Sequence, residues 1–203
     1  MQFLDARVEL YSEFLEGRRA QFNAFLREVK AVLNSFWDGE KQEGVPPSEW
    51  KVVLAFTHGD AKGGVTMHPD AENEDTHWGI ASQWWTPFYS VGVRRLHYHT
   101  CHVGHYFADP VQFPVIKRGA EGSNDDLMTV TAWENKIGQY DETGDMCAPN
   151  DDYLFRGMPL RRAMDKASSR NGQRGFNSIW ELKVSVTGRG AEVRERRTPT
   201  AGR

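Results

Sequence analysis

The sequence predicts an α/β protein, namely a three-layer α/β/α sandwich built on a mostly parallel sheet. Two observations lead to this class. Residues 52–56 form a continuous apolar run, which is typical of a strand buried on both faces of a parallel sheet. Further strand patterns alternate along the chain with helical patterns, as in proteins whose parallel strands are linked by helices.

The 203 residues suit one domain, and we place that domain over residues 1–187. A helix is expected over residues 18–37, because apolar side chains recur there every three or four positions. After the strand at 52–56, the pattern predicts strands at 96–101 and 127–133, a helix at 154–166 and a strand at 179–186.

The last of these strands and the residues after it differ from the rest. Residues 179–186 alternate apolar and polar side chains, which suits a half-exposed strand at a sheet edge. Residues 188–203 contain five arginines and few apolar side chains, so we expect a mobile Arg-rich tail.

Composition limits the classes of function. The net charge of -3 gives no general attraction to nucleic acid, and no apolar run is long enough to span a membrane. The first five residues lack the layout of a signal peptide. The two cysteines, Cys101 and Cys147, do not form a disulfide framework, so we expect a soluble protein of the reducing cytoplasm.

Two strand ends carry the residues of a candidate catalytic site. His58 and Gly59 follow the first apolar strand, and Cys101 ends the second, 43 residues after the histidine. Adjacent parallel strands would bring the imidazole and the thiol to one edge of the sheet, where α/β proteins build active sites. A histidine can activate a cysteine as a nucleophile. The backbone N–H groups of Gly59 and Cys101 are the expected oxyanion donors.

These motifs resemble those of caspase-like (clan CD) cysteine peptidases, including metacaspases and CHAT-domain peptidases. In that group a His-Gly pair after an apolar strand precedes a Cys on the next strand. Residues 99–104 read HTCHVG, close to the metacaspase pattern DxCHxG, with His99 in place of the aspartate. The likeness covers residues 6–187, without the family's first strand and first helix.

The resemblance implies a thiol protease, that is, a hydrolase that uses a Cys101–His58 dyad to cleave protein or peptide substrates. Glu134 follows the third predicted strand, where this fold commonly places a substrate-pocket residue, and an acid there implies cleavage after basic residues. Asp60 and His99 are further substrate-binding candidates. The peptidase reading requires no cofactor and no metal. A regulatory partner or a homodimer is compatible with the family.

Other interpretations remain open. One is a non-catalytic caspase-like domain that serves as a scaffold or regulator. Another is a metal-dependent enzyme built on a dense cluster of candidate ligands, which are His97, His99, Cys101, His102 and His105. The acidic run over residues 141–152 could bind calcium, although such runs are usually solvated.

Overall fold

The computed structural model describes residues 27, 31, 37–38, 40–56, 58–66, 77–117, 126–137, 178–187 and 190–198. The chain divides into two compact units, Met1–Pro47 and Ser48–Arg203. In the first unit, β1 (Trp37–Asp38) pairs with β2 (Glu43–Gly44) in an antiparallel hairpin. The helices expected over 18–37 and 154–166 lie almost entirely outside the described residues.

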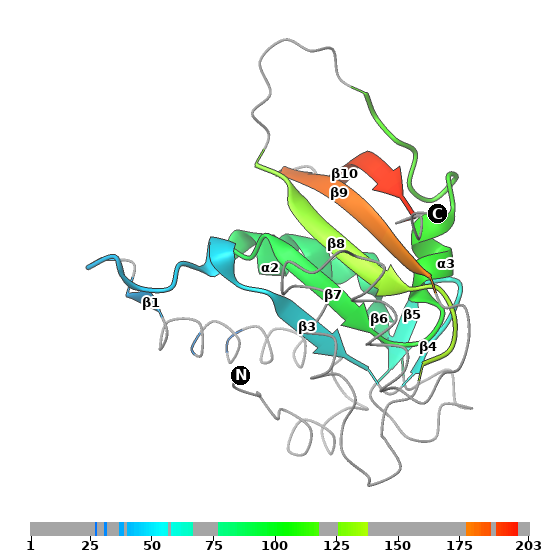
Figure 1. Cartoon of the computed structure of the whole chain (residues 1–203), viewed down its shortest axis with the longest axis horizontal. Helices are drawn as coiled ribbons and strands as arrows, with labels where there is room; N and C mark the ends of the chain where they lie inside the picture. Colours follow the sequence, from blue (N-terminus) through cyan, green and yellow to red (C-terminus); the bar gives the residue numbers. More distant parts are fainter. Residues whose placement is uncertain are drawn as a thin grey trace, which may run out of the picture. The chain divides into compact units, whose positions relative to one another are not determined.

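The second unit contains a five-stranded sheet (Figure 1). Its strands, in spatial order, are β10 (Gly190–Arg197), β9 (Ile179–Thr187), β8 (Met128–Trp133), β7 (Arg95–His99) and β3 (Val52–Ala55). The pairs β3–β7 and β7–β8 are parallel, whereas β8–β9 and β9–β10 are antiparallel. The sheet is therefore mixed, with its parallel part at one side.

The prediction of a three-layer α/β/α sandwich on a mostly parallel sheet is wrong. Within the described residues the two α-helices are short, α2 (Trp85–Ser90) and α3 (Val103–Ala108), and their aromatic side chains pack on one face of the sheet. Only two residues separate β9 from β10, and so short a link joins antiparallel strands. No helix in this part of the chain has the length and hydrophobicity needed to cross a bilayer.

An aromatic cluster fills the space between the sheet and the helices. The Phe56 ring stacks on Tyr98 with 6.2 Å between centroids, and Phe107 meets Tyr98 edge-on at 5.7 Å. The Tyr98 hydroxyl donates to the Ala81 carbonyl at 2.6 Å. Burial raises the pKa of Tyr98 well above its usual value, so this hydroxyl stays protonated as a donor. The cluster is completed by Trp84, Trp85, Phe88 and Phe113.

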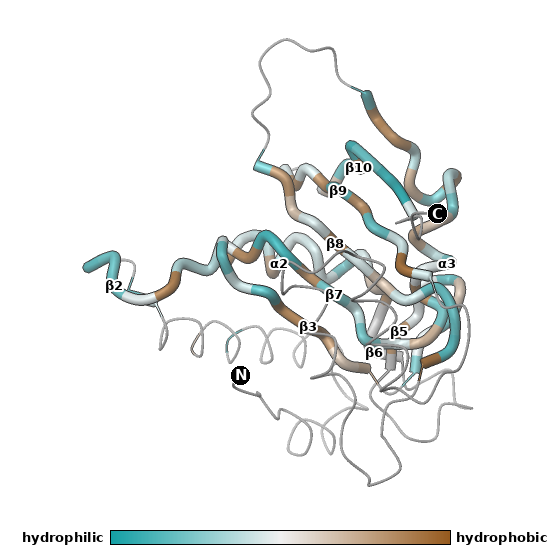
Figure 2. Tube along the Cα trace, viewed as in Figure 1, coloured by the Kyte–Doolittle hydropathy of each residue, from teal (hydrophilic) through white to brown (hydrophobic). Residues whose placement is uncertain are grey.

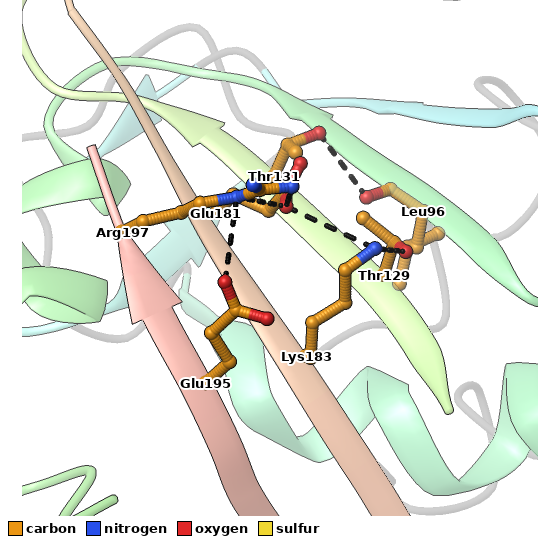
Figure 3. Close-up of polar contacts among 7 residues, drawn as sticks. All are labelled: Leu96, Thr129, Thr131, Glu181, Lys183, Glu195 and Arg197. Atoms are coloured by element: carbon orange, nitrogen blue, oxygen red, sulfur yellow. Dashed lines mark hydrogen bonds and ion pairs between the residues drawn. The ribbon is translucent and has the colours of Figure 1, made fainter. Parts of the chain in front are cut away.

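On the opposite face of the sheet, β9 and β10 carry charged side chains (Figure 3). Arg197 pairs with Glu181 at 2.6 Å, and Lys183 donates to Thr129 at 2.7 Å. Glu181 is only 15% exposed and also lies 3.8 Å from Lys183. Ion pairs and hydrogen bonds stabilise this half-buried polar patch on β8–β10.

The expectation of a mobile tail over 188–203 is wrong for Gly190–Arg197, which form β10. In this strand Val193 is buried and the arginines lie along a mostly hydrophilic ribbon (Figure 2). Charged residues are typical of edge strands, where they discourage pairing with other chains. The strand at 179–187 is therefore not an edge, because β10 covers it. Beyond β10, Ile116 donates its N–H to the Val193 carbonyl at 2.9 Å.

A small antiparallel sheet follows β3. It contains β4 (His58–Gly59), β5 (Gly64–Thr66) and β6 (His77–Ile80). The short helical turns η1 (Pro47–Glu49) and η3 (Ala81–Trp84) complete the described elements. The hairpin of β4 and β5 begins with the His-Gly pair, so it positions one half of the candidate site.

An ion pair at the start of β8 gives a stability prediction. Arg94 holds Asp126 through Nε and Nη2 at 2.7 and 2.6 Å, and this hydrogen bonding lowers the pKa of Asp126. A lowered folded-state pKa contributes stability above the unfolded pKa of about 3.9, and that contribution is lost as the pH falls through the folded value. Because Asp126 is 61% exposed, we expect Asp126→Asn to cost at most about 1 kcal/mol near neutral pH.

Urea unfolding of the wild type and Asp126→Asn over a range of pH measures this contribution. The two stabilities should converge below the folded pKa of Asp126, where the carboxyl is protonated in both states. A difference that persists unchanged into strong acid would show that the carboxylate charge is not its cause.

Candidate functional site

Three strand ends meet at one edge of the main sheet. Because β3, β7 and β8 are parallel, their carboxyl ends share this edge, where open α/β sheets bind ligands. His58 follows β3, Cys101 follows β7 and Glu134 follows β8. The prediction that the histidine and cysteine strands are adjacent and parallel is confirmed, and Phe56 extends their pairing by donating to the His99 carbonyl at 3.3 Å.

The glycines of both motifs are required by close contacts. A Cβ on Gly59 would lie 2.5 Å from the Cys101 carbonyl oxygen and 2.5 Å from Thr100 Oγ1. A Cβ on Gly104 would lie 2.6 Å from Glu134 Cα. The His-Gly turn therefore packs directly against the cysteine backbone, and α3 packs against the end of β8.

The Cys101 thiol is nearly buried, with the residue 9% exposed, and it contacts the segment after β8. The Ile137 N–H donates to Sγ at 3.3 Å, and the thiol can donate to the Ile137 carbonyl at 3.5 Å. Trp133, Ile137 and Ile179 form an apolar cluster with the cysteine. The backbone of Ile137 can therefore donate to Sγ when the sulfur is a thiolate and accept from it when the sulfur is a thiol.

A sharp turn connects β7 to α3 immediately after the cysteine. His102 has φ 61°, a left-handed conformation that is uncommon outside glycine. The Cys101 carbonyl accepts from the Val103 N–H at 2.8 Å, and the His102 N–H donates to the Asn135 carbonyl at 3.4 Å. This turn sets Cys101 between the end of a buried strand and the start of a helix.

The three predicted substrate-binding residues have different surroundings. Glu134 is half-buried, and its Oε1 accepts from the Trp180 indole N–H at 3.2 Å. Asp60 Oδ1 accepts from the backbone N–H groups of Lys62 and Gly64, so this carboxylate closes its own turn. His99 is fully buried, which is inconsistent with contact to a substrate side chain. Of the three, Glu134 is the one whose side chain is neither fully buried nor used to close its own turn.

The histidines of the candidate metal cluster, His97, His99, His102 and His105, do not form a metal-sized site. His97 is fully buried and its Nδ1 lies 2.9 Å from Thr131 Oγ1, while His102 and His105 stack with 6.2 Å between ring centroids. In the portion of the chain that the structure describes, no three His, Cys, Asp or Glu side chains form a group that could hold a metal ion. The acidic run over 141–152, the candidate calcium site, lies outside this portion.

Two residues near the cysteine were missed by the sequence analysis. Ile137 acts through its backbone, which leaves no side-chain signal. Thr100 directly precedes Cys101 and is fully buried against Gly59. Its position next to the cysteine was the available signal, but a threonine at a strand end is usually structural.

No family model, curated protein or solved structure matches the chain.

Proposed function

We propose that this protein is a cysteine-type endopeptidase in which Cys101 is the nucleophile and His58 the general base. The observation that carries this proposal is the contact of Gly59 with Cys101, whose carbonyl oxygen is 2.5 Å from where a Cβ on Gly59 would be. This contact puts the residue next to the imidazole against the residue that bears the thiol. The relation to caspase-like peptidases is part of the proposal and rests on the two motifs.

The reaction is acyl transfer through a thioester. His58 takes the proton of the Cys101 thiol, and the sulfur attacks the peptide carbonyl to form the S–C bond. The C–N bond then breaks, and the imidazolium returns its proton to the leaving amine. Water hydrolyses the thioester with His58 again as base, which releases the acid and restores the thiol.

Backbone geometry supports an oxyanion site beside the cysteine. The Asp60 N–H donates to the Gly64 carbonyl at 3.1 Å, so these two residues form a hydrogen-bonded pair. Hydrogen-bonded and non-hydrogen-bonded pairs alternate in an antiparallel ladder, so the next pair, Gly59 and Val65, exchanges no hydrogen bonds. The Gly59 N–H therefore points away from β5. Together with the Cys101 N–H it can stabilise the oxyanion as the thiol adds to the carbonyl.

The Ile137 N–H supports the nucleophile. At 3.3 Å from Sγ it can donate a charge-assisted hydrogen bond once the sulfur is ionised. When the sulfur attacks the substrate this hydrogen bond is released, so the segment after β8 would respond to the chemical step.

A panel of internally quenched peptides tests the activity. We expect cleavage that is abolished by prior alkylation of the thiol and unaffected by metal chelation. Cleavage that survives complete alkylation of Cys101 would exclude this thiol as the nucleophile.

Glu134 defines the proposed substrate class, which is peptides with Arg or Lys before the scissile bond. Its carboxylate accepts one indole N–H and keeps further acceptor capacity for a cation. We expect Glu134→Gln to lower kcat/KM for these substrates about 10–100-fold, because a neutral amide loses the charge-assisted pairing. Steady-state kinetics on matched peptides with Arg, Gln or Leu at that position measure the change. Equal losses on all three peptides would contradict a role in recognition.

One observation favours a second candidate, a non-catalytic domain in which Cys101 is structural. The residue is only 9% exposed and packs with Trp133, Ile137 and Ile179. A thiol-reactive peptide probe separates the two functions, because a structural thiol reacts no faster in the folded protein than in urea.

The proposed cellular location follows from the redox requirement of the Cys101 thiol. A free catalytic thiol requires reducing conditions, which supports a cytoplasmic location. The proposed partners are protein or peptide substrates.

A further inference from the structure

The hydroxyl of Thr100 lies buried between the two halves of the candidate site. Thr100 is fully buried, and its Oγ1 lies 2.5 Å from where a Cβ on Gly59 would be. The residue follows β7 and directly precedes Cys101. It therefore contacts the His-Gly turn on one side and is bonded to the nucleophilic residue on the other.

This hydroxyl has no hydrogen-bond partner among the described residues. A buried donor without an acceptor is unfavourable, and valine would fill the same volume without that cost. A buried polar group that is kept without a partner therefore needs an explanation, and a role in function is one. Neighbouring polar groups behave differently, since His97 pairs with Thr131 and Tyr98 with Ala81. In the described part of the chain Trp85 Nε1 also lacks a partner, but the Thr100 hydroxyl is the one that lies against the His-Gly turn.

We propose that Thr100 is a positioning residue for His58. A small shift of the turn toward Cys101 lets the hydroxyl donate to the Gly59 carbonyl, which faces away from β5 and leaves the Gly59 N–H for the oxyanion. That hydrogen bond holds the imidazole in line with the thiol, and it is made when the site is engaged. The inference rests on the proposed dyad, although not on which bond the enzyme cleaves.

The test uses the alkylation rate of Cys101, which does not require a peptide substrate. Thr100→Val keeps the shape of the side chain and removes the hydroxyl, whereas Thr100→Ser keeps the hydroxyl. Both are made in full-length protein carrying Cys147→Ser, so that one thiol reacts. Iodoacetamide rates are measured from about pH 5 to pH 9, a range that covers imidazole and thiol titration, and His58→Ala is the reference.

We expect Thr100→Val to melt at or above the wild-type temperature and yet to alkylate about tenfold more slowly near pH 6, with the pH profile of His58→Ala. Thr100→Ser should retain the wild-type profile. A Thr100→Val profile equal to wild type would overturn the proposal, as would equal losses in both variants.

The peptidase proposal fails separately. If no peptide is cleaved but the alkylation results hold, Thr100 positions His58 in a site with another reaction. If cleavage occurs and Thr100→Val leaves both kcat/KM and alkylation unchanged, the peptidase stands and the positioning role is excluded.

Discussion

Cys101→Ala and His58→Ala are each expected to lower kcat/KM for peptide cleavage at least about 10³-fold. Loss of the nucleophile or of its base removes the covalent route, and only binding and oxyanion stabilisation remain. Initial rates with a quenched peptide that has Arg before the scissile bond measure the loss. The two substitutions should not add in the double variant, because the residues act as one unit.

The folded state of each variant must be checked, since Cys101 packs with Trp133, Ile137 and Ile179. Near-UV circular dichroism and thermal melting provide that check. His105→Ala is the matched control, because this exposed histidine lies four residues after the cysteine on α3 and stacks on His102. Retention of most activity in a folded Cys101→Ala or His58→Ala protein would exclude the dyad.

Gly59→Ala has the second-largest expected effect. The added methyl group would lie 2.5 Å from the Cys101 carbonyl oxygen and 2.5 Å from Thr100 Oγ1, so the turn must move away from the cysteine. We expect a loss of about 1–3 kcal/mol in the free energy of unfolding, as for other overpacked sites. Activity should fall about 10²-fold or more, because a displacement near 1 Å is enough to misalign reacting groups. Urea unfolding and kcat/KM report the two effects.

Gly190→Ala provides the control for an added methyl group at a glycine. Nothing lies within 4 Å of its Cβ position, although its φ of +125° makes alanine unfavourable. This variant should lose stability and keep its activity. If Gly59→Ala behaved in the same way, the contact between the His-Gly turn and Cys101 would have no part in function.

The sequence was sufficient to predict the strands that form the site. Residues 52–55 and 128–133 are apolar enough to be recognised, whereas 95–99 contain an arginine and two histidines and are recognised by the alternation around Leu96 and Tyr98. Parallel pairing of the three strands places His58, Cys101 and Glu134 at one edge. The contribution of charged strands was not predictable in the same way. In β10 only Val193 is buried, so there is no hydrophobic pattern from which to recognise the strand. Its backbone pairing with β9 makes this segment a strand.

The details of the site depended on tertiary contacts. His99 follows the strand pattern as a candidate, but its burial is set by how the sheet is covered. Asp60 could have been recognised as a turn residue, because Asp followed by two glycines at 63 and 64 is typical of a side-chain-closed turn. The Ile137 contact with Cys101 joins segments 36 residues apart through backbone atoms, for which the sequence has no pattern.

The most direct test of the central claim is the site and rate of covalent modification by a peptidyl acyloxymethyl ketone with Arg next to the reactive group. The protein is treated under reducing conditions, digested, and its cysteine-containing peptides are identified by mass spectrometry. We expect rapid modification of Cys101, slow modification of Cys147, and a large loss of Cys101 modification in His58→Ala and in urea. Modification of Cys101 that is equally slow in the native wild type, His58→Ala and the unfolded protein would contradict the central claim.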